Sequence, residues 1–146
     1  MSNGFEGRCL CGNVTYRSDT EPMLSAHCHC EDCRRSSGTG HGTHVVAAAQ
    51  GFEITGEVRF YDKPADSGNV VSRGFCPTCG SPVLSKNASM PDMVFVRASS
   101  LDDPDILTPK MVVYANRAPA WDLVDPALPS FAGMPDAAPQ DIIAEG

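Results

Sequence analysis

Short runs in which hydrophobic and polar residues alternate extend along most of this chain, with turn residues between the runs. A period of two is typical of strands that bury one face. Residues 52–55 and 58–61 flank Gly56, and this arrangement suggests a hairpin. The other runs predict a hairpin over 5–17 and strands over 23–27, 43–48, 70–75, 82–85, 93–97 and 111–114. Many short strands separated by turns favour an all-β fold.

Two segments interrupt this pattern. Residues 32–37 are polar and end at Gly38, which favours one or two helical turns. From Ala115 onward the chain is rich in proline, so we expect an extended segment that wraps the domain, with Trp121 and Phe131 as packing anchors. The length predicts one zinc-binding domain over 1–134, followed by a flexible C-terminal tail over 135–146.

Charge and hydropathy exclude several classes of function. The formal net charge is −7, and an acidic surface repels phosphate backbones, so we expect no nucleic-acid partner. The apolar run 45–49 is too short to cross a bilayer, and residues 1–7 lack the basic start and apolar core of a signal peptide. We therefore expect a cytoplasmic protein with no membrane partner.

The seven cysteines carry the clearest chemical signal. An odd number excludes a fully paired disulfide framework within one chain. Their spacings are C-x-C, C-x-C-x-x-C and C-x-x-C, which are typical of metal-binding turns. In a reducing compartment such thiols bind metal or carry out redox chemistry rather than cross-link loops.

Four cysteines form two widely separated pairs, and together they predict a closed structural zinc site. This four-cysteine cluster comprises Cys9, Cys11, Cys76 and Cys79. Alternate residues of an extended hairpin point to the same face, so Cys9 and Cys11 can reach one ion. Gly80 follows the second pair, where the backbone of such turns commonly needs a positive φ. The ion would join the N-terminal hairpin to the middle of the chain, and its binding energy would become folding energy.

The remaining sulfurs, Cys28, Cys30 and Cys33, form a three-cysteine cluster. Three protein ligands and one open position are typical of catalytic zinc. Two alternatives remain open: His27 or His29 could close the tetrahedron, or two cysteines could form a reversible disulfide without metal. Both histidines neighbour a ligating cysteine in an extended run, so we expect them to point to the opposite face.

Charged neighbours of these motifs suggest a site for an acidic ligand. Arg34, Arg35 and Arg73 could hold its carboxylates in bidentate fashion, although solvated surface arginines would look the same in the sequence. His41 and His44 follow a glycine-rich loop and could carry protons near neutral pH, or could be ordinary loop and strand histidines.

The combined motifs resemble the glutathione-dependent formaldehyde-activating enzyme family. The likeness covers nearly the whole chain and includes the later elements Leu101-Asp102-Asp103-Pro104, Trp121 and Leu128-Pro129-x-Phe131. Its central pieces are Gly7-x-Cys9-x-Cys11-Gly12, Cys28-His29-Cys30-x-x-Cys33-Arg34-x-Ser36-x-Gly38 and Phe75-Cys76-x-x-Cys79-Gly80. The chain departs from the family at Met111 and Val112, where members usually carry a histidine followed by an isoleucine.

This resemblance implies a β-tent architecture of small antiparallel sheets and two zinc ions, a structural one on the four-cysteine cluster and a catalytic one on the three-cysteine cluster. The implied reaction adds glutathione to formaldehyde and is classed with carbon–sulfur lyases. An alternative is a zinc-stabilised module that binds a small thiol such as glutathione without turnover. The sequence sets neither the physiological substrate nor the oligomeric state, and the second zinc site could be only partly occupied.

Overall fold

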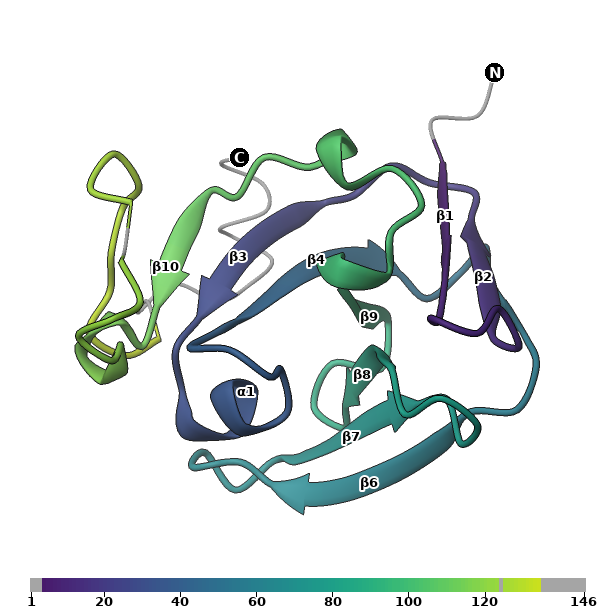
Figure 1. The fold of residues 1–146 in the computed structure, drawn as a ribbon, viewed down its shortest axis with the longest axis horizontal. Helices are drawn as coiled ribbons and strands as arrows, with labels where there is room; N and C mark the ends of the chain where they lie inside the picture. The colour runs from purple at the N-terminus through teal and green to yellow at the C-terminus, as the bar shows by residue number, and fades with distance from the viewer. Residues whose placement is uncertain (1–3, 124, 135–146) are drawn as a thin grey trace.

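A computed structural model describes residues 4–123 and 125–134, and its strands form two sheets (Figure 1). The smaller sheet has the order β1-β2-β5, with bounds Phe5–Arg8, Thr15–Ser18 and Phe52–Thr55. The larger sheet has the order β10-β3-β4-β9-β8-β7-β6, with bounds Met111–Val113, Leu24–Cys28, Gly42–Ala48, Met93–Arg97, Pro82–Asn87, Val70–Phe75 and Arg59–Pro64. The helical elements are α1 (Glu31–Arg35) and the single turns η1 (Ala98–Ser100), η2 (Pro104–Ile106) and η3 (Ala115–Arg117).

The predicted all-β class is confirmed, and the named strands pair antiparallel except for β10, which runs parallel to β3. The predicted hairpin across Gly56 is wrong, because β5 pairs with β2 whereas β6 pairs with β7. Gly56 has φ +102°, and a side chain there would meet the carbonyl oxygen of Asn13. Alternation identifies both strands, but it does not say which neighbour each strand joins.

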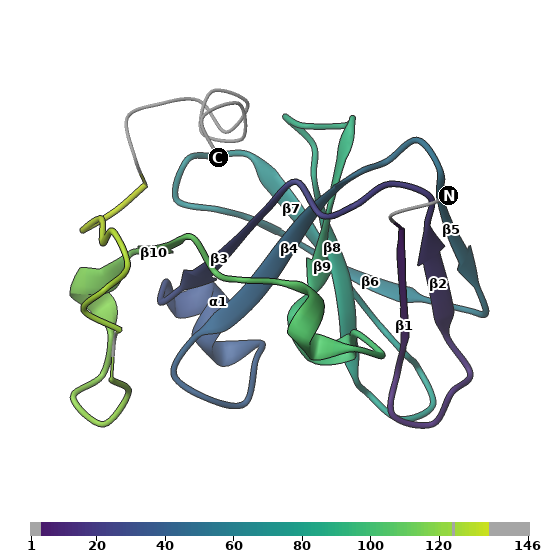
Figure 2. The same cartoon turned by 90° about the horizontal axis from the view of Figure 1, so that it is seen from above.

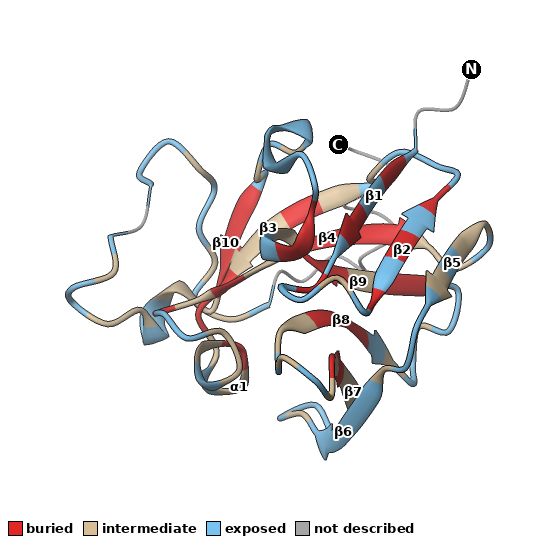
Figure 3. Cartoon of the chain, turned by 45° about the vertical axis from the view of Figure 1, so that its right-hand side comes forward, coloured by how far each residue is buried: buried red, intermediate tan, exposed pale blue. Residues whose placement is uncertain are grey.

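The main hydrophobic core draws on both sheets (Figure 3). The smaller sheet and its turn contribute Phe5, Val14 and Tyr16, and the larger sheet contributes Val45 and Val96 among others. Tyr16 is buried with its hydroxyl 2.6 Å from Ser100 Oγ, and burial raises the pKa of Tyr16 to about 12. The main core covers one face of the larger sheet, so a functional site on this sheet is expected on its opposite face.

That opposite face carries a second buried cluster, formed by Cys28, Cys33, Met111 and Val113. Helix α1 lies beside β3 and β4 in both views of the fold (Figures 1 and 2). Side-chain contacts from β6 and β9 also reach this helix, at Asp32 within α1 and at Ser36 directly after it. This face thus brings strands from both ends of the larger sheet to the helix that bears Cys33.

The Pro-rich C-terminal segment begins with the turn η3, and only its residues 129–133 run extended along β10, so the predicted extended form holds for that part. The Phe131 N–H donates to the Val112 carbonyl oxygen at 2.9 Å, and the Val112 N–H donates to the Pro129 carbonyl oxygen at 2.9 Å. Phe131 packs against the second cluster, but Trp121 is 68% exposed, so its predicted anchoring role is wrong. The predicted tail over 135–146 lies outside the described residues. Within the described ranges, no helix has the length and apolar character to cross a bilayer.

Candidate metal centres and active site

The four-cysteine cluster forms where two turns meet. Cys9 and Cys11 lie in the turn after β1, and Cys76 and Cys79 lie in the turn after β7. Cys9 Sγ lies 3.6 Å from Cys11 Sγ, which in turn lies 3.7 Å from Cys76 Sγ. All four sulfurs lie within 4.8 Å of one another. A tetrahedron with metal–sulfur bonds of about 2.3 Å has edges of about 3.8 Å, so these four residues fit a thiolate-bound ion such as zinc.

Backbone geometry supports this arrangement. The Val14 N–H donates to Cys9 Sγ at 3.3 Å, and the Thr78 N–H lies 3.4 Å from Cys76 Sγ. Gly80 has φ +79°, the left-handed conformation predicted for this turn. Contact with Ser81 lowers the pKa of Cys79 to about 5, which favours a thiolate at neutral pH.

The three-cysteine cluster sits where β3 ends and α1 begins. Cys28 is the last residue of β3, Cys30 caps the N-terminus of α1, and Cys33 lies within the helix. The Cys33 N–H donates to Cys30 Sγ at 3.3 Å. The Cys30 sulfur therefore accepts a hydrogen bond from an N–H of the first helical turn, which has no partner within the helix. The three sulfurs lie within 4.8 Å of one another, with Cys28 and Cys33 buried and Cys30 partly exposed.

Without a metal, three sulfurs so close together share their charge unequally. Contacts with Cys28 and Cys33 lower the pKa of Cys30 to about 2, whereas contact with Cys30 raises the pKa of Cys28 far above its ordinary value. At Cys33, contact with Cys28 lowers the pKa, but contact with Cys30 and burial outweigh it and raise the pKa to about 11. Without a metal, one cysteine of the cluster is therefore a thiolate that accepts hydrogen bonds from the other two thiols. A bound divalent cation would allow all three cysteines to ionise.

Strand register places two arginines and a histidine on the same face as Cys28. Cys28 lies opposite Gly42, so His44, two residues along β4, shares that face. His44 lies directly opposite Arg97 of β9. The residue pairing between β9 and β8, and then between β8 and β7, places Arg73 of β7 on this face as well. The sequence motifs gave no sign of Arg97, because its neighbours are set by pairing between distant strands.

Arg97 holds the helix that bears Cys33. The residue is 4% exposed, and its side chain donates to Ser36 Oγ at 2.6 Å and to the Ser36 carbonyl oxygen at 3.3 Å. Burial lowers the pKa of Arg97, while the nearby Cys33 opposes that shift. The guanidinium group therefore lies in the field of the three-cysteine cluster and stabilises the C-terminal end of α1.

The neighbouring histidines turn away from the sulfurs, as predicted. His27 Nδ1 lies 2.7 Å from Thr43 Oγ1, and His29 Nε2 lies 2.9 Å from Asp122 Oδ2. The imidazole nearest the cluster belongs instead to His44, whose Nε2 lies 3.4 Å from Cys33 Sγ. It is not among the atoms that lie within 4.8 Å of one another with the three sulfurs. Burial lowers the pKa of His44 to about 3, so its ring is neutral at physiological pH.

The three arginines predicted to bind substrate lie in different surroundings. The charge of Arg73 helps to lower the pKa of Cys30, which places this side chain in the electrostatic field of the cluster. Arg34 is partly buried in α1, and Arg35 is exposed and donates to Glu31 at 2.8 Å.

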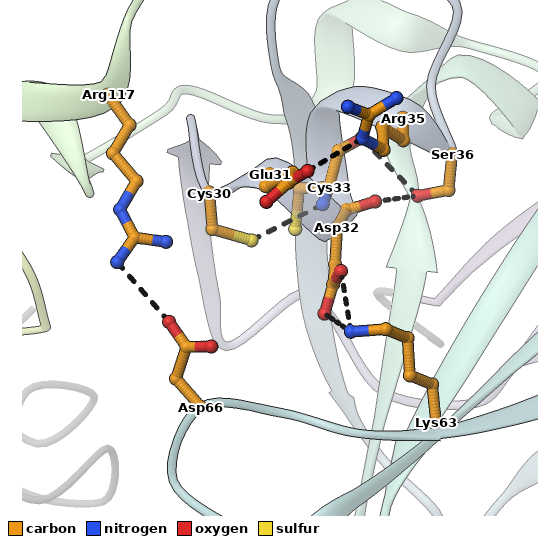
Figure 4. A network of polar contacts seen from close by, with 9 residues as sticks. All are labelled: Cys30, Glu31, Asp32, Cys33, Arg35, Ser36, Lys63, Asp66 and Arg117. Atoms are coloured by element: carbon orange, nitrogen blue, oxygen red, sulfur yellow. Dashed lines mark hydrogen bonds and ion pairs between the residues drawn. The ribbon is translucent and has the colours of Figure 1, made fainter.

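Two further cations escaped the sequence reasoning (Figure 4). Lys63 of β6 contacts Asp32 of α1 at 3.0 Å, and Arg117 lies 3.3 Å from Asp66. Both pairs join segments that are far apart in the sequence, so no local motif announces them.

Two surface depressions lie away from the three-cysteine cluster. One of about 410 Å³ lies beside Phe52 and Met93, and one of about 390 Å³ lies beside Arg8 and Asp102. Neither is lined by a cysteine, so neither coincides with the candidate chemistry.

Comparison with known proteins decides the family. Residues 4–117 match the family described as glutathione-dependent formaldehyde-activating enzyme, and this range contains all seven cysteines. The chain belongs to this family. The resemblance expected from the motifs is thereby confirmed, and formaldehyde activation with glutathione is the chemistry that the family name suggests.

Solved structures support the fold of this family member. A crystal structure of a Rhodobacter sphaeroides protein is similar with a TM-score of 0.55 and 19% identity, over 86% of this chain and 98% of that one. At that identity the likeness concerns the fold alone. No curated protein matches the chain.

Proposed function

We propose that this chain is a zinc-dependent carbon–sulfur lyase-like enzyme that acts on an adduct of a small thiol and an aldehyde, such as S-hydroxymethylglutathione. The observation that carries the proposal is the three-cysteine cluster. Its sulfurs converge within 4.8 Å, one of them is accessible, and the adjacent histidines are engaged elsewhere. Free thiols in this number suit a reducing compartment, and we therefore assign the protein to the cytoplasm.

The two cysteine clusters take different roles in this proposal. Cys9, Cys11, Cys76 and Cys79 would hold a structural zinc, while Cys28, Cys30 and Cys33 would hold a catalytic one that could accept an incoming sulfur. When bound by three thiolates, zinc is a weak Lewis acid that favours a soft thiolate substrate over water.

The reaction itself is a reversible addition. The thiolate sulfur of glutathione attacks the carbonyl carbon of formaldehyde, a C–S bond forms, and the carbonyl oxygen takes up a proton. In the reverse direction the C–S bond breaks, its electron pair returns to sulfur, and the hydroxyl proton is released. His44 orients Cys33 rather than accepting a proton, because a group with a pKa of about 3 is a poor base at neutral pH.

The arginines supply charge and orientation. Arg97 is buried against α1 and offsets the negative charge of the thiolates. Arg34, Arg35 and Arg73 bind the carboxylates of the tripeptide. Among these three, Arg73 is the arginine whose charge lowers the pKa of Cys30. Arg35 must leave Glu31 to do so, a small cost because both side chains of this pair are exposed to solvent.

The test is to measure zinc per chain together with the formation and breakdown of S-hydroxymethylglutathione. We expect Cys30→Ala to lose one zinc and to slow both directions by more than about 100-fold, beyond what loss of an outer-shell partner costs. Its far-UV circular dichroism should match the wild type, since the four-cysteine cluster is intact. Unchanged rates would refute the open-site mechanism. Glutathione binding without turnover in the wild type would identify a thiol-binding module instead.

A further inference from the structure

A second polar cluster lies apart from the sulfurs, where the end of β3 meets the loop before β4. His29 Nε2 lies 2.9 Å and His41 Nδ1 lies 2.7 Å from the same oxygen, Asp122 Oδ2. The side chain of His29 is 2% exposed, that of Asp122 is 13% exposed and that of His41 is 25% exposed. The cluster is thus formed inside the molecule and reaches solvent mainly at His41.

We propose that His29, His41 and Asp122 form a third metal site, which takes a divalent first-row transition ion through two imidazole nitrogens and one carboxylate oxygen. The three ligand atoms lie within 4.8 Å of one another. With bonds of about 2.1 Å, adjacent ligands lie about 3.0 Å apart in an octahedron and about 3.4 Å apart in a tetrahedron. The two nitrogen–oxygen distances are hydrogen-bond distances, and both lie within about 0.3 Å of the octahedral edge, so the three ligand atoms could surround an ion after a small movement.

The donor set separates this site from the cysteine clusters. Two imidazoles and a carboxylate suit zinc, iron(II) or cobalt(II), whereas calcium and magnesium prefer oxygen ligands alone and copper(I) prefers sulfur. The site shares no ligand with either cysteine cluster, so the proposal stands independently of the lyase chemistry.

The sequence builds this site from three distant segments. Asp122 lies 93 residues beyond His29 and 81 beyond His41. Gly40 permits the approach, because a Cβ at this position would collide with the Asp122 carboxylate. A bound ion would therefore cross-link the Pro-rich segment to the glycine-rich loop and to the end of β3.

The test uses the full chain with both cysteine clusters loaded with zinc and adds cobalt(II). We expect one further cobalt per chain, with the weak visible absorption of nitrogen and oxygen ligation and no sulfur charge-transfer band, together with a higher Tm. Asp122→Asn keeps the shape and one acceptor oxygen but removes the anionic ligand, so the affinity should fall by more than about tenfold. His41→Ala should have the same effect.

His27→Ala is the matched control. Its ring lies 4.9 Å from the His41 ring, but its Nδ1 is engaged by Thr43, so cobalt binding should persist. If the wild type takes up no further cobalt, or if Asp122→Asn binds it equally well, the three residues are only a hydrogen-bonded triad and the proposal fails. Should His41→Ala not fold, Asp122→Asn decides the question, because its Tm without metal reports its fold directly.

Discussion

Arg97 is a buried cation for which the described residues offer no carboxylate within salt-bridge distance. Its compensation comes from Ser36 at the end of α1 and from the nearby sulfurs. A buried charge in such a position is costly unless its hydrogen bonds are made, so Arg97 should be sensitive to small changes in geometry.

We therefore expect Arg97→Gln to lower the free energy of unfolding by about 2 kcal/mol or more, the value of charge-assisted hydrogen bonds lost from a buried site. Arg35→Gln is the matched control. It removes an exposed arginine from the same helix, and because its ion pair with Glu31 is exposed to solvent, its loss should change the stability much less. Urea unfolding at one fixed metal content measures both variants. Equal effects would contradict the role assigned to Arg97.

The unequal pKa values of the three-cysteine cluster make a second prediction. At neutral pH the metal-free cluster holds one thiolate, at Cys30, because the pKa of Cys28 is strongly raised and that of Cys33 is raised to about 11. Zinc binding should therefore release about two protons, and the apparent affinity should rise about a hundredfold per pH unit around neutrality. Calorimetry in buffers of different ionisation enthalpy counts these protons. Release of fewer than one would show that the thiols are already ionised.

At the scale of the elements, the sequence predicted the strands better than their partners. Alternation located β3, β4 and β7 to β10 closely, and the Gly38 stop located α1. It could not pair β5 with β2, and it gave no sign that β10 runs parallel to β3. The cysteine clusters were predictable because each pair or triplet is local in sequence. Arg97 was not singled out, and His44 was considered only as a proton carrier or an ordinary histidine, because only the β4–β9 register brings the two residues to one face.

The glycine-rich loop offers a prediction at this scale. Gly40→Ala places a methyl group against the Asp122 carboxylate, so we expect it to displace Asp122 from His29 and His41 and to loosen residues 118–123. Hydrogen exchange should speed up there, and Tm should fall. Gly133→Ala is the control, since a Cβ at that position meets no atom within 4 Å. If both variants behave alike, the contact between loop and segment does not restrain the chain.

At the scale of the whole molecule, the two cysteine clusters belong to different parts of the fold. Cys9 and Cys76 are members of the main core that joins the two sheets, whereas Cys28 and Cys33 belong to the second cluster on the opposite face. Loss of the first cluster should separate the sheets. Loss of the second should affect only the region around α1 and β10.

Removal of metal should therefore occur in two stages that differ in structural consequence. Apparent binding energies for structural zinc are about 10–16 kcal/mol, comparable with the whole stability of a domain at about 5–15 kcal/mol. Cys76→Ser should accordingly leave the chain largely unfolded, while Cys30→Ser, which removes a partly exposed ligand, should stay folded with one zinc fewer. Titration of the wild type with a chelator, followed by circular dichroism and zinc release, should give a first loss of metal without loss of β-structure and a second loss that coincides with unfolding. A single transition in which metal and structure disappear together would mean that both ions support the fold equally, and the division between a scaffold site and a chemical site would have to be abandoned.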